Sequence, residues 1–307
     1  MPHNSLPPEL LLRGTATQWS STAHLQTRWD WRAVGNFVGG GTGAGLLLAA
    51  TLLAPTVDAY RVQAFTALAI IAIGLLCIML KIGRPTRAYN MFLRVRTKSW
   101  MTREGFVMPA LFGFGALSLF LPGVGVVAWL ATASALFFLY CQARILLAAK
   151  GIPAWSQDSI VPLVLATGLV EGAGVGAIFA ALRPDSDALW VTVLLLAALG
   201  FRQLAWARYR GELEQVGAPD EATSALDGFA AVYRPLGQWT PALLLIAATF
   251  FGGVLESVLV IVAALLAVAM GWGLKYTIVT MAAFFQRKSF SLSAAMAGRG
   301  QLKRPGS

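Results

Sequence analysis

Glu104 is the residue of this sequence that is best placed for acid–base chemistry. It stands where the chain enters an apolar stretch, and the residues before it supply positive charge: Arg84, Arg87 and Arg103. A carboxylate near the N-terminal end of a helix is stabilised by the helix dipole. A carboxylate at the edge of the hydrocarbon could also exchange protons with a membrane-soluble substrate. The sequence leaves both roles open.

Glu171 is a second candidate, in the middle of the apolar stretch 161–182. An ionised carboxylate is costly at that depth and is usually paired, neutral or functional. No basic residue of the same stretch can neutralise it, and it stands nearly alone among apolar residues. We expect Glu171 either to belong to a proton path or to be protonated and hydrogen-bonded across a helix contact.

Residues that ligate haem, metal ions or iron–sulfur clusters are scarce. Cys77 and Cys141 fall inside apolar stretches, and the two histidines, His3 and His24, precede the first of these. A haem within a membrane bundle needs axial His or Met ligands, and a [4Fe-4S] cluster needs four thiolates. We therefore expect no haem, no iron–sulfur cluster and no metal in this chain.

The composition of the chain predicts the helices that must position these residues. Of the 307 residues, 57% are hydrophobic and 12% are charged, whereas about a quarter of a soluble domain is charged. One bilayer crossing takes about 20 apolar helical residues, and uninterrupted apolar runs favour helices over a barrel. Eight windows emerge: 31–53, 62–80, 106–121, 124–147, 161–182, 188–206, and two from a division of 236–285 near Gly252 and Gly253. We predict an all-α integral membrane bundle of eight transmembrane helices.

The distribution of basic residues predicts the orientation, because short cytoplasmic loops collect Lys and Arg. With eight crossings, 22 of the 24 basic residues fall on the side of the termini, and Arg61 and Arg183 fall opposite. Both tails, 1–30 and 286–307, are therefore predicted to be cytoplasmic. Topology and contact with anionic membrane lipid account for the net charge of +10, so no nucleic-acid partner is needed.

Two similarities at nearly the same offset suggest an internal repeat. Residues 41–50 resemble residues 172–181, with glycine at alternate positions, and 108–111 resemble 240–243. This pattern predicts two parallel four-helix halves, 31–147 and 148–285. The glycines either allow close packing of helices or mark an unwound helix at a transport site.

A set of short motifs resembles a known family. They occur in this order: Asn36-Phe37-Val38-Gly39-Gly40, Gly83-Arg84-Pro85, Arg87-Ala88, Ser99-Trp100 and Arg103-Glu104. In these motifs and in its eight helices, the chain resembles the membrane-anchor subunits of the polysulfide reductase and dimethyl sulfoxide reductase families. The resemblance covers most of the chain. Lys81 stands where the family has histidine, and it either donates to a quinone carbonyl or only sets the topology.

The resemblance implies a function within a larger complex. The chain would anchor a molybdopterin catalytic subunit and a four-cluster, ferredoxin-like iron–sulfur subunit in the bacterial inner membrane. It would bind menaquinone or ubiquinone as substrate and exchange electrons with the iron–sulfur partner. Glu104 would accept a proton from the quinol. The quinone would contact Asn36, Lys81, Arg84, Arg87, Trp100 and Tyr140. Asn36 could equally hydrogen-bond between helices. Tyr140 and Gln142, which could both reach a quinone headgroup, could instead satisfy the backbone or lie near the interface.

Other interpretations remain open at this point. Residues 26–33 look similar to anchors of phenylacetyl-CoA:acceptor oxidoreductases, whose substrate would be oxidised in the cytoplasm. A secondary transporter or channel with a parallel repeat is the competing class, and it predicts several ionisable groups at mid-membrane. The acidic segment 209–233 is either a docking site for a partner or a solvated loop.

Overall fold

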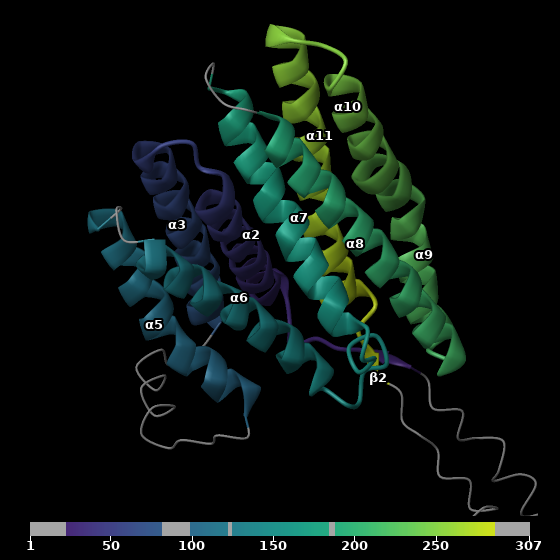
Figure 1. Cartoon of the computed structure of the whole chain (residues 1–307). Helices are drawn as coiled ribbons and strands as arrows, with labels where there is room; N and C mark the ends of the chain where they lie inside the picture. Colours follow the sequence, from purple (N-terminus) through teal and green to yellow (C-terminus); the bar gives the residue numbers. More distant parts are fainter. Residues whose placement is uncertain (1–22, 82–98, 122–124, 184–187, 286–307) are drawn as a thin grey trace, which may run out of the picture.

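The computed structural model describes residues 23–81, 99–121, 125–183 and 188–285. These residues form an all-α bundle in which two groups of long helices lie side by side (Figure 1). The first group comprises α2 (Trp31–Leu53), α3 (Val57–Lys81), α5 (Trp100–Phe120) and α6 (Gly125–Leu147). The second comprises α7 (Ile160–Ala181), α8 (Ala188–Gln215), α9 (Asp220–Val232), α10 (Thr240–Ala248) and α11 (Gly253–Tyr276). The helical class predicted from the sequence is confirmed.

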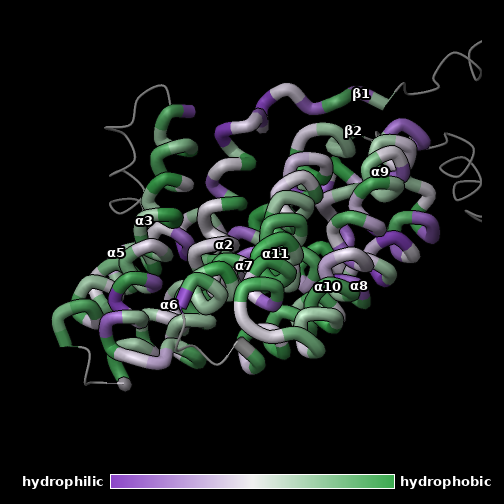
Figure 2. The backbone as a smooth tube through the Cα atoms, turned by 90° about the horizontal axis from the view of Figure 1, so that it is seen from above, coloured by the Kyte–Doolittle hydropathy of each residue, from purple (hydrophilic) through white to green (hydrophobic). Residues whose placement is uncertain are grey.

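Six of the described helices are long and apolar enough to cross a membrane, namely α2, α3, α6, α7, α8 and α11. Apolar residues predominate along most of the helices in Figure 2, while the chain from β1 (His24–Leu25) into α2 is more polar. Large apolar side chains also face outward: Phe65, Leu80 and Leu204 are 65%, 68% and 72% exposed. Such exposure fits an apolar solvent, so the chain has the character of a multi-pass membrane protein.

Helices occupy most of the segment 209–233, which the sequence predicts to be a loop. α8 continues to Gln215 and α9 begins at Asp220. The prediction is wrong because it follows apolar runs, whereas polar residues extend these helices, as in the Arg208–Glu212 ion pair at 3.0 Å. α9 runs through the π-helical segment η2 (Tyr233–Trp239) into α10, so these three segments form one long helix (Figure 1).

The division between the last two helices falls where the sequence predicts it. α10 ends at Ala248 and α11 begins at Gly253, whose φ of +66° is a conformation that glycine adopts without steric cost. The junctions between the windows 106–121 and 124–147 and between 161–182 and 188–206 lie largely outside the described residues.

α2 and α7 cross in close contact through glycine. A Cβ added to Gly172 would overlap the backbone of Gly45 and Leu46, and one added to Gly45 would overlap the carbonyl oxygen of Gly168. Both helices are continuous through their glycine-rich stretches. The glycines therefore serve close helix packing, and the unwound helix of the alternative interpretation is not observed in α2 or α7.

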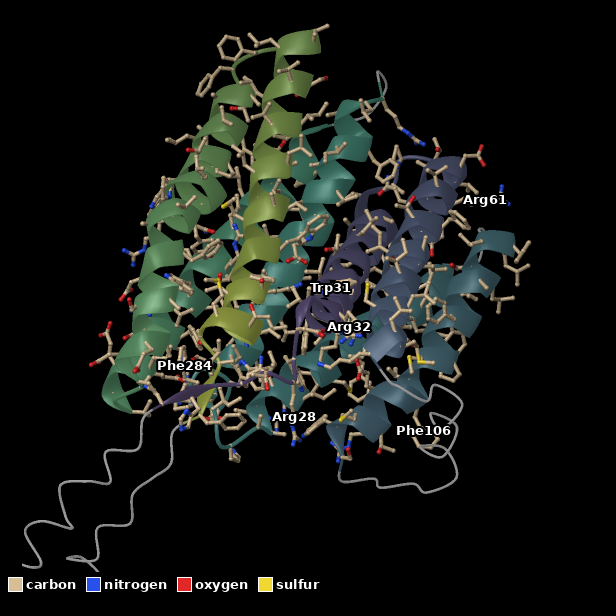
Figure 3. The ribbon with its side chains drawn as sticks, turned by 180° about the vertical axis from the view of Figure 1, so that it is seen from behind. Arg28, Trp31, Arg32, Arg61, Phe106 and Phe284 are labelled. Atoms are coloured by element: carbon tan, nitrogen blue, oxygen red, sulfur yellow. The ribbon has the colours of Figure 1, made fainter. Side chains whose placement is uncertain are left out.

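Both ends of the described chain meet at one end of the bundle. β1 pairs with β2 (Phe284–Phe285) in antiparallel fashion, and Gln26 Nε2 donates to the carbonyl oxygen of Val279 at 3.1 Å. Figure 3 shows Arg28 and Phe284 at this end and Arg61 at the other. At the start of α2, hydrogen bonding to the Arg32 guanidinium lowers the pKa of Asp30 to about 2, so this N-cap is ionised at neutral pH.

Candidate functional site

Glu104 lies one turn into α5 and faces a buried amide on α2. Asn36 Nδ2 donates to Glu104 Oε1 at 3.5 Å, and Gln142 Nε2 of α6 donates to the main-chain oxygen of Asn36 at 2.9 Å. Gly40 makes room for this arrangement, since a Cβ there would overlap the Gln142 amide. We call Asn36, Glu104 and Gln142 the Glu104 cluster. The structure thus joins two residues that the family resemblance singles out, and it adds Gln142.

Two acceptors of the Glu104 cluster are unused. Asn36 Oδ1 and Gln142 Oε1 are buried and accept no hydrogen bond from the described residues. A buried polar atom without a partner costs free energy, so such atoms are candidates for contact with a ligand. An amide can accept from a hydroxyl group or, when turned over, donate to a carbonyl. These atoms could therefore bind either redox form of a quinone.

Trp100, at the start of α5, and Tyr140, near the end of α6, form a separate contact. Their rings meet edge to face with centroids 5.6 Å apart. The guanidinium carbons of Arg103 and Arg144 lie 4.2 Å and 4.8 Å from the centre of the Trp100 ring. These cation–π contacts cover the indole, so Trp100 positions two arginines.

Of the remaining residues of the expected site, the structure describes Lys81 alone. Lys81 ends α3, and its Nζ lies 5.9 Å from the centre of the Trp29 ring. This nitrogen is buried and has no hydrogen-bond partner among the described residues. Arg84 and Arg87 lie in 82–98, outside the described residues.

Glu171 is paired, so the expectation that it stands nearly alone is wrong. Lys275 Nζ of α11 lies 2.6 Å from Glu171 Oε2 and also donates to the main-chain oxygen of Phe37 at 3.0 Å. Thr42 Oγ1 donates to the same carboxylate oxygen at 2.9 Å. The Glu171 and Lys275 side chains are 0% and 3% exposed. This is a buried ion pair with further hydrogen bonds on both partners.

Arg202 of α8 lies beside this pair and is fully buried. It donates to Gln238 Oε1 at 2.9 Å, to the main-chain oxygen of Ala267 at 3.1 Å, and to that of Gly237. Gly237 and Gln238 belong to η2, and π-helical turns are frequent at functional sites. We call Glu171, Arg202 and Lys275 the buried charge cluster.

Glu171 and Arg202 approach each other across Gly271 of α11. A Cβ built on Gly271 would lie 3.0 Å from Glu171 Oε1 and 3.3 Å from Arg202 Nη1. Glu171 Oε1 has no hydrogen-bond partner among the described residues. The carboxylate is therefore bonded to Lys275 through Oε2, while its other oxygen and the Arg202 guanidinium both approach Gly271.

The sequence assigns Arg202 and Lys275 to the cytoplasmic side together with the other basic residues, and the structure corrects this assignment. Both side chains are buried inside the bundle. The chain stays largely apolar after Lys275 as far as Phe285, and this was the signal for a buried lysine. Arg202 gives a weaker signal, because Gln203 and only a short apolar run separate it from Arg208.

Two consecutive glycines of α2 leave the space that side chains of the two clusters occupy. A Cβ on Gly40 would overlap the Gln142 amide, and one on the next residue, Gly41, would overlap Lys275 Nζ. Consecutive residues of a helix point in different directions, about 100° apart. α2 therefore separates the Glu104 cluster from the buried charge cluster and contacts both.

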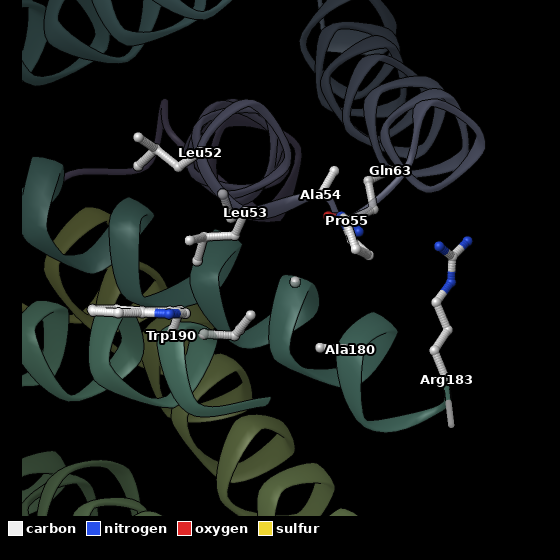
Figure 4. Close-up of a pocket in the computed structure, with 11 residues that line it drawn as sticks. Leu52, Leu53, Ala54, Pro55, Gln63, Ala180, Arg183 and Trp190 are labelled. Atoms are coloured by element: carbon white, nitrogen blue, oxygen red, sulfur yellow. The ribbon is translucent and has the colours of Figure 1, made fainter. Parts of the chain in front are cut away.

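A cavity of about 290 Å³ lies at the end of the bundle where α2 joins α3. Its lining includes Leu53, Pro55, Gln63, Arg183 and Trp190 (Figure 4). No residue of either cluster contributes to this lining. The cavity is therefore distinct from the candidate site at Glu104.

Comparison with known proteins does not assign a family: no protein-family model and no curated protein matches this chain. Among the described residues, no group of three or more His, Cys, Asp or Glu side chains is arranged to hold a metal ion. The two clusters are therefore interpreted from their geometry and from the motif resemblance. They place a carboxylate with unused amide acceptors against one face of α2 and a buried ion pair against another face of the same helix.

Proposed function

We propose that this chain is the membrane-anchor subunit of a molybdopterin oxidoreductase and binds quinol at the Glu104 cluster. It crosses the bacterial inner membrane eight times as two parallel four-helix halves, with both termini in the cytoplasm. The observation that supports this best is the contact between Asn36 and Glu104, 3.5 Å apart although 68 residues separate them. These two residues belong to different motifs of the resemblance and share one site.

The chemistry of quinol oxidation suits this site. A quinol that becomes a quinone releases two electrons and two protons. Glu104 is positioned to take one proton as general base, and the second proton passes to bulk water. The amide oxygens of Asn36 and Gln142 are free to accept from the hydroxyl groups. The electrons pass to the iron–sulfur partner subunit, because this chain is expected to carry no redox centre of its own.

Quinol-dependent electron transfer in the assembled complex tests the proposal. We expect Glu104→Gln to lower the rate of iron–sulfur reduction by quinol about 100-fold, the lower end of the effect of losing a general base. The control is Glu214→Gln, which removes an exposed carboxylate of α8. Rapid-mixing spectroscopy on membranes gives both rates. Equal rates for Glu104→Gln and the control would exclude Glu104 as the proton acceptor.

A transport function is the second candidate, and the buried charge cluster favours it. A transporter predicts several ionisable groups in the interior, and Glu171, Arg202 and Lys275 meet there. These groups contact α2, α7, α8 and α11, which would be the helices around a central site. They also fit the proton path expected for Glu171, which an anchor subunit could contain as well.

A further inference from the structure

The buried charge cluster contains more cations than carboxylates. Glu171 is its one acid, whereas Arg202 and Lys275 are both basic. The described groups that contact them are neutral at pH 7: the Phe37 carbonyl and Thr42 from α2, and Tyr233 and Gln238 from η2. Trp272 of α11 donates to Thr42 in turn. With every group in its usual form, the cluster has one excess positive charge in a site without access to water.

Arg202 cannot remove this excess. A guanidinium keeps its proton in proteins, and its hydrogen bonds here go to neutral oxygens of Gln238, Gly237 and Ala267. Its guanidinium carbon lies 5.3 Å from the centre of the Tyr233 ring, and the described carboxylate near it is Glu171, across Gly271. Glu171 is therefore the shared counter-ion of Arg202 and Lys275, and one negative charge cannot balance both.

Two protonation changes are open to the cluster, and they have opposite effects. Protonation of Glu171 would leave Arg202 and Lys275 as two buried cations without a counter-ion, which is strongly unfavourable. Loss of a proton from the Lys275 ammonium would leave a neutral amine beside an opposite-charge pair of Glu171 and Arg202. Charge balance therefore selects the lysine.

We propose that Lys275 is the proton-exchanging group of this cluster and that Glu171 stays ionised in both states. The step is the loss of one proton from Nζ, which becomes a neutral amine and can still bond to Glu171 Oε2 and the Phe37 carbonyl. The Phe37 carbonyl adjoins the Asn36 carbonyl, which accepts from Gln142 of the Glu104 cluster. Lys275 would keep this role whether or not a quinone binds.

The test is the pH dependence of unfolding of the purified chain in lipid nanodiscs without quinone. Stability rises with pH wherever the unfolded state holds more protons than the folded state. The folded state gives up the Lys275 proton while the exposed lysine of the unfolded state still holds it. We therefore expect the unfolding midpoint of the natural protein to rise with pH, with a contribution of about one proton per chain.

Lys275→Met should remove this contribution and still fold, because Glu171 and Arg202 remain a balanced pair. Lys150→Met, which removes an exposed lysine, should keep the slope of the natural protein. Parallel slopes for Lys275→Met and the natural protein would overturn the proposal. Infrared spectroscopy gives a second readout: a protonated carboxyl band that grows as pH falls and is absent from Glu171→Gln would also overturn it.

Discussion

A Glu171→Gln substitution is expected to lower the free energy of unfolding by about 3–5 kcal/mol, the usual cost of removing one partner from a buried ion pair. The glutamine keeps the volume and the hydrogen bond with Thr42 but removes the one negative charge between Lys275 and Arg202. Arg202 and, whenever it holds its proton, Lys275 are then buried without a counter-ion. Chemical or thermal unfolding in nanodiscs measures the loss, with Glu214→Gln as the control for an exposed carboxylate.

Substitution of Lys275 should lower the free energy of unfolding less than Glu171→Gln does. Lys275→Met leaves one positive and one negative group in the cluster, so its loss should be clearly smaller than that of Glu171→Gln. If Lys275→Met destabilised the protein as much as Glu171→Gln, Arg202 would not contribute to the charge balance. The order of the two variants therefore tests whether the three groups act as one cluster.

Gly172→Ala is expected to destabilise the protein by about 3 kcal/mol, the upper end of typical overpacking. The added methyl group would overlap the backbone of Gly45 and Leu46, which cannot rotate away as a side chain can. The α2–α7 crossing would have to open, which would displace both Thr42 and Glu171 from their shared hydrogen bond.

Gly200→Ala is the matched control for this variant. Gly200 also lies in a helix, but a Cβ there would meet no atom within 4 Å. Alanine favours the helix by up to about 1 kcal/mol over glycine, so this variant should be as stable as the natural protein or slightly more stable. A Gly172→Ala protein with an unchanged unfolding midpoint would show that α2 and α7 can separate at no cost.

The sequence predicts the helices best where an apolar run has clear ends. The window 31–53 coincides with α2 because Asp30 caps its start and Pro55 follows its end. It predicts α8 less well because the apolar window ends at residue 206, ahead of the charged residues from Arg208 onward, although the helix continues to Gln215. Apolar runs locate the membrane core, but they do not show where a helix ends in water.

The contents of the two clusters were harder to predict. The contact of Glu104 with Asn36 could be predicted from the sequence because both residues belong to motifs of one resemblance. Gln142 belongs to none of these motifs. The pair of Glu171 with Lys275 joins residues 104 positions apart on separate helices. Without knowledge of which helix faces pack together, no spacing in the sequence links these two residues.

Binding of a fluorescent quinol-analogue inhibitor to the purified chain tests the central claim most directly. Fluorescence quenching should show saturable binding by the natural protein, with binding about tenfold weaker in Glu104→Gln, a loss of about 1.4 kcal/mol. Binding by Glu214→Gln should be unchanged. Equal binding by Glu104→Gln would place the quinone elsewhere, and no binding even with the partner subunits present would contradict the quinone function and favour transport.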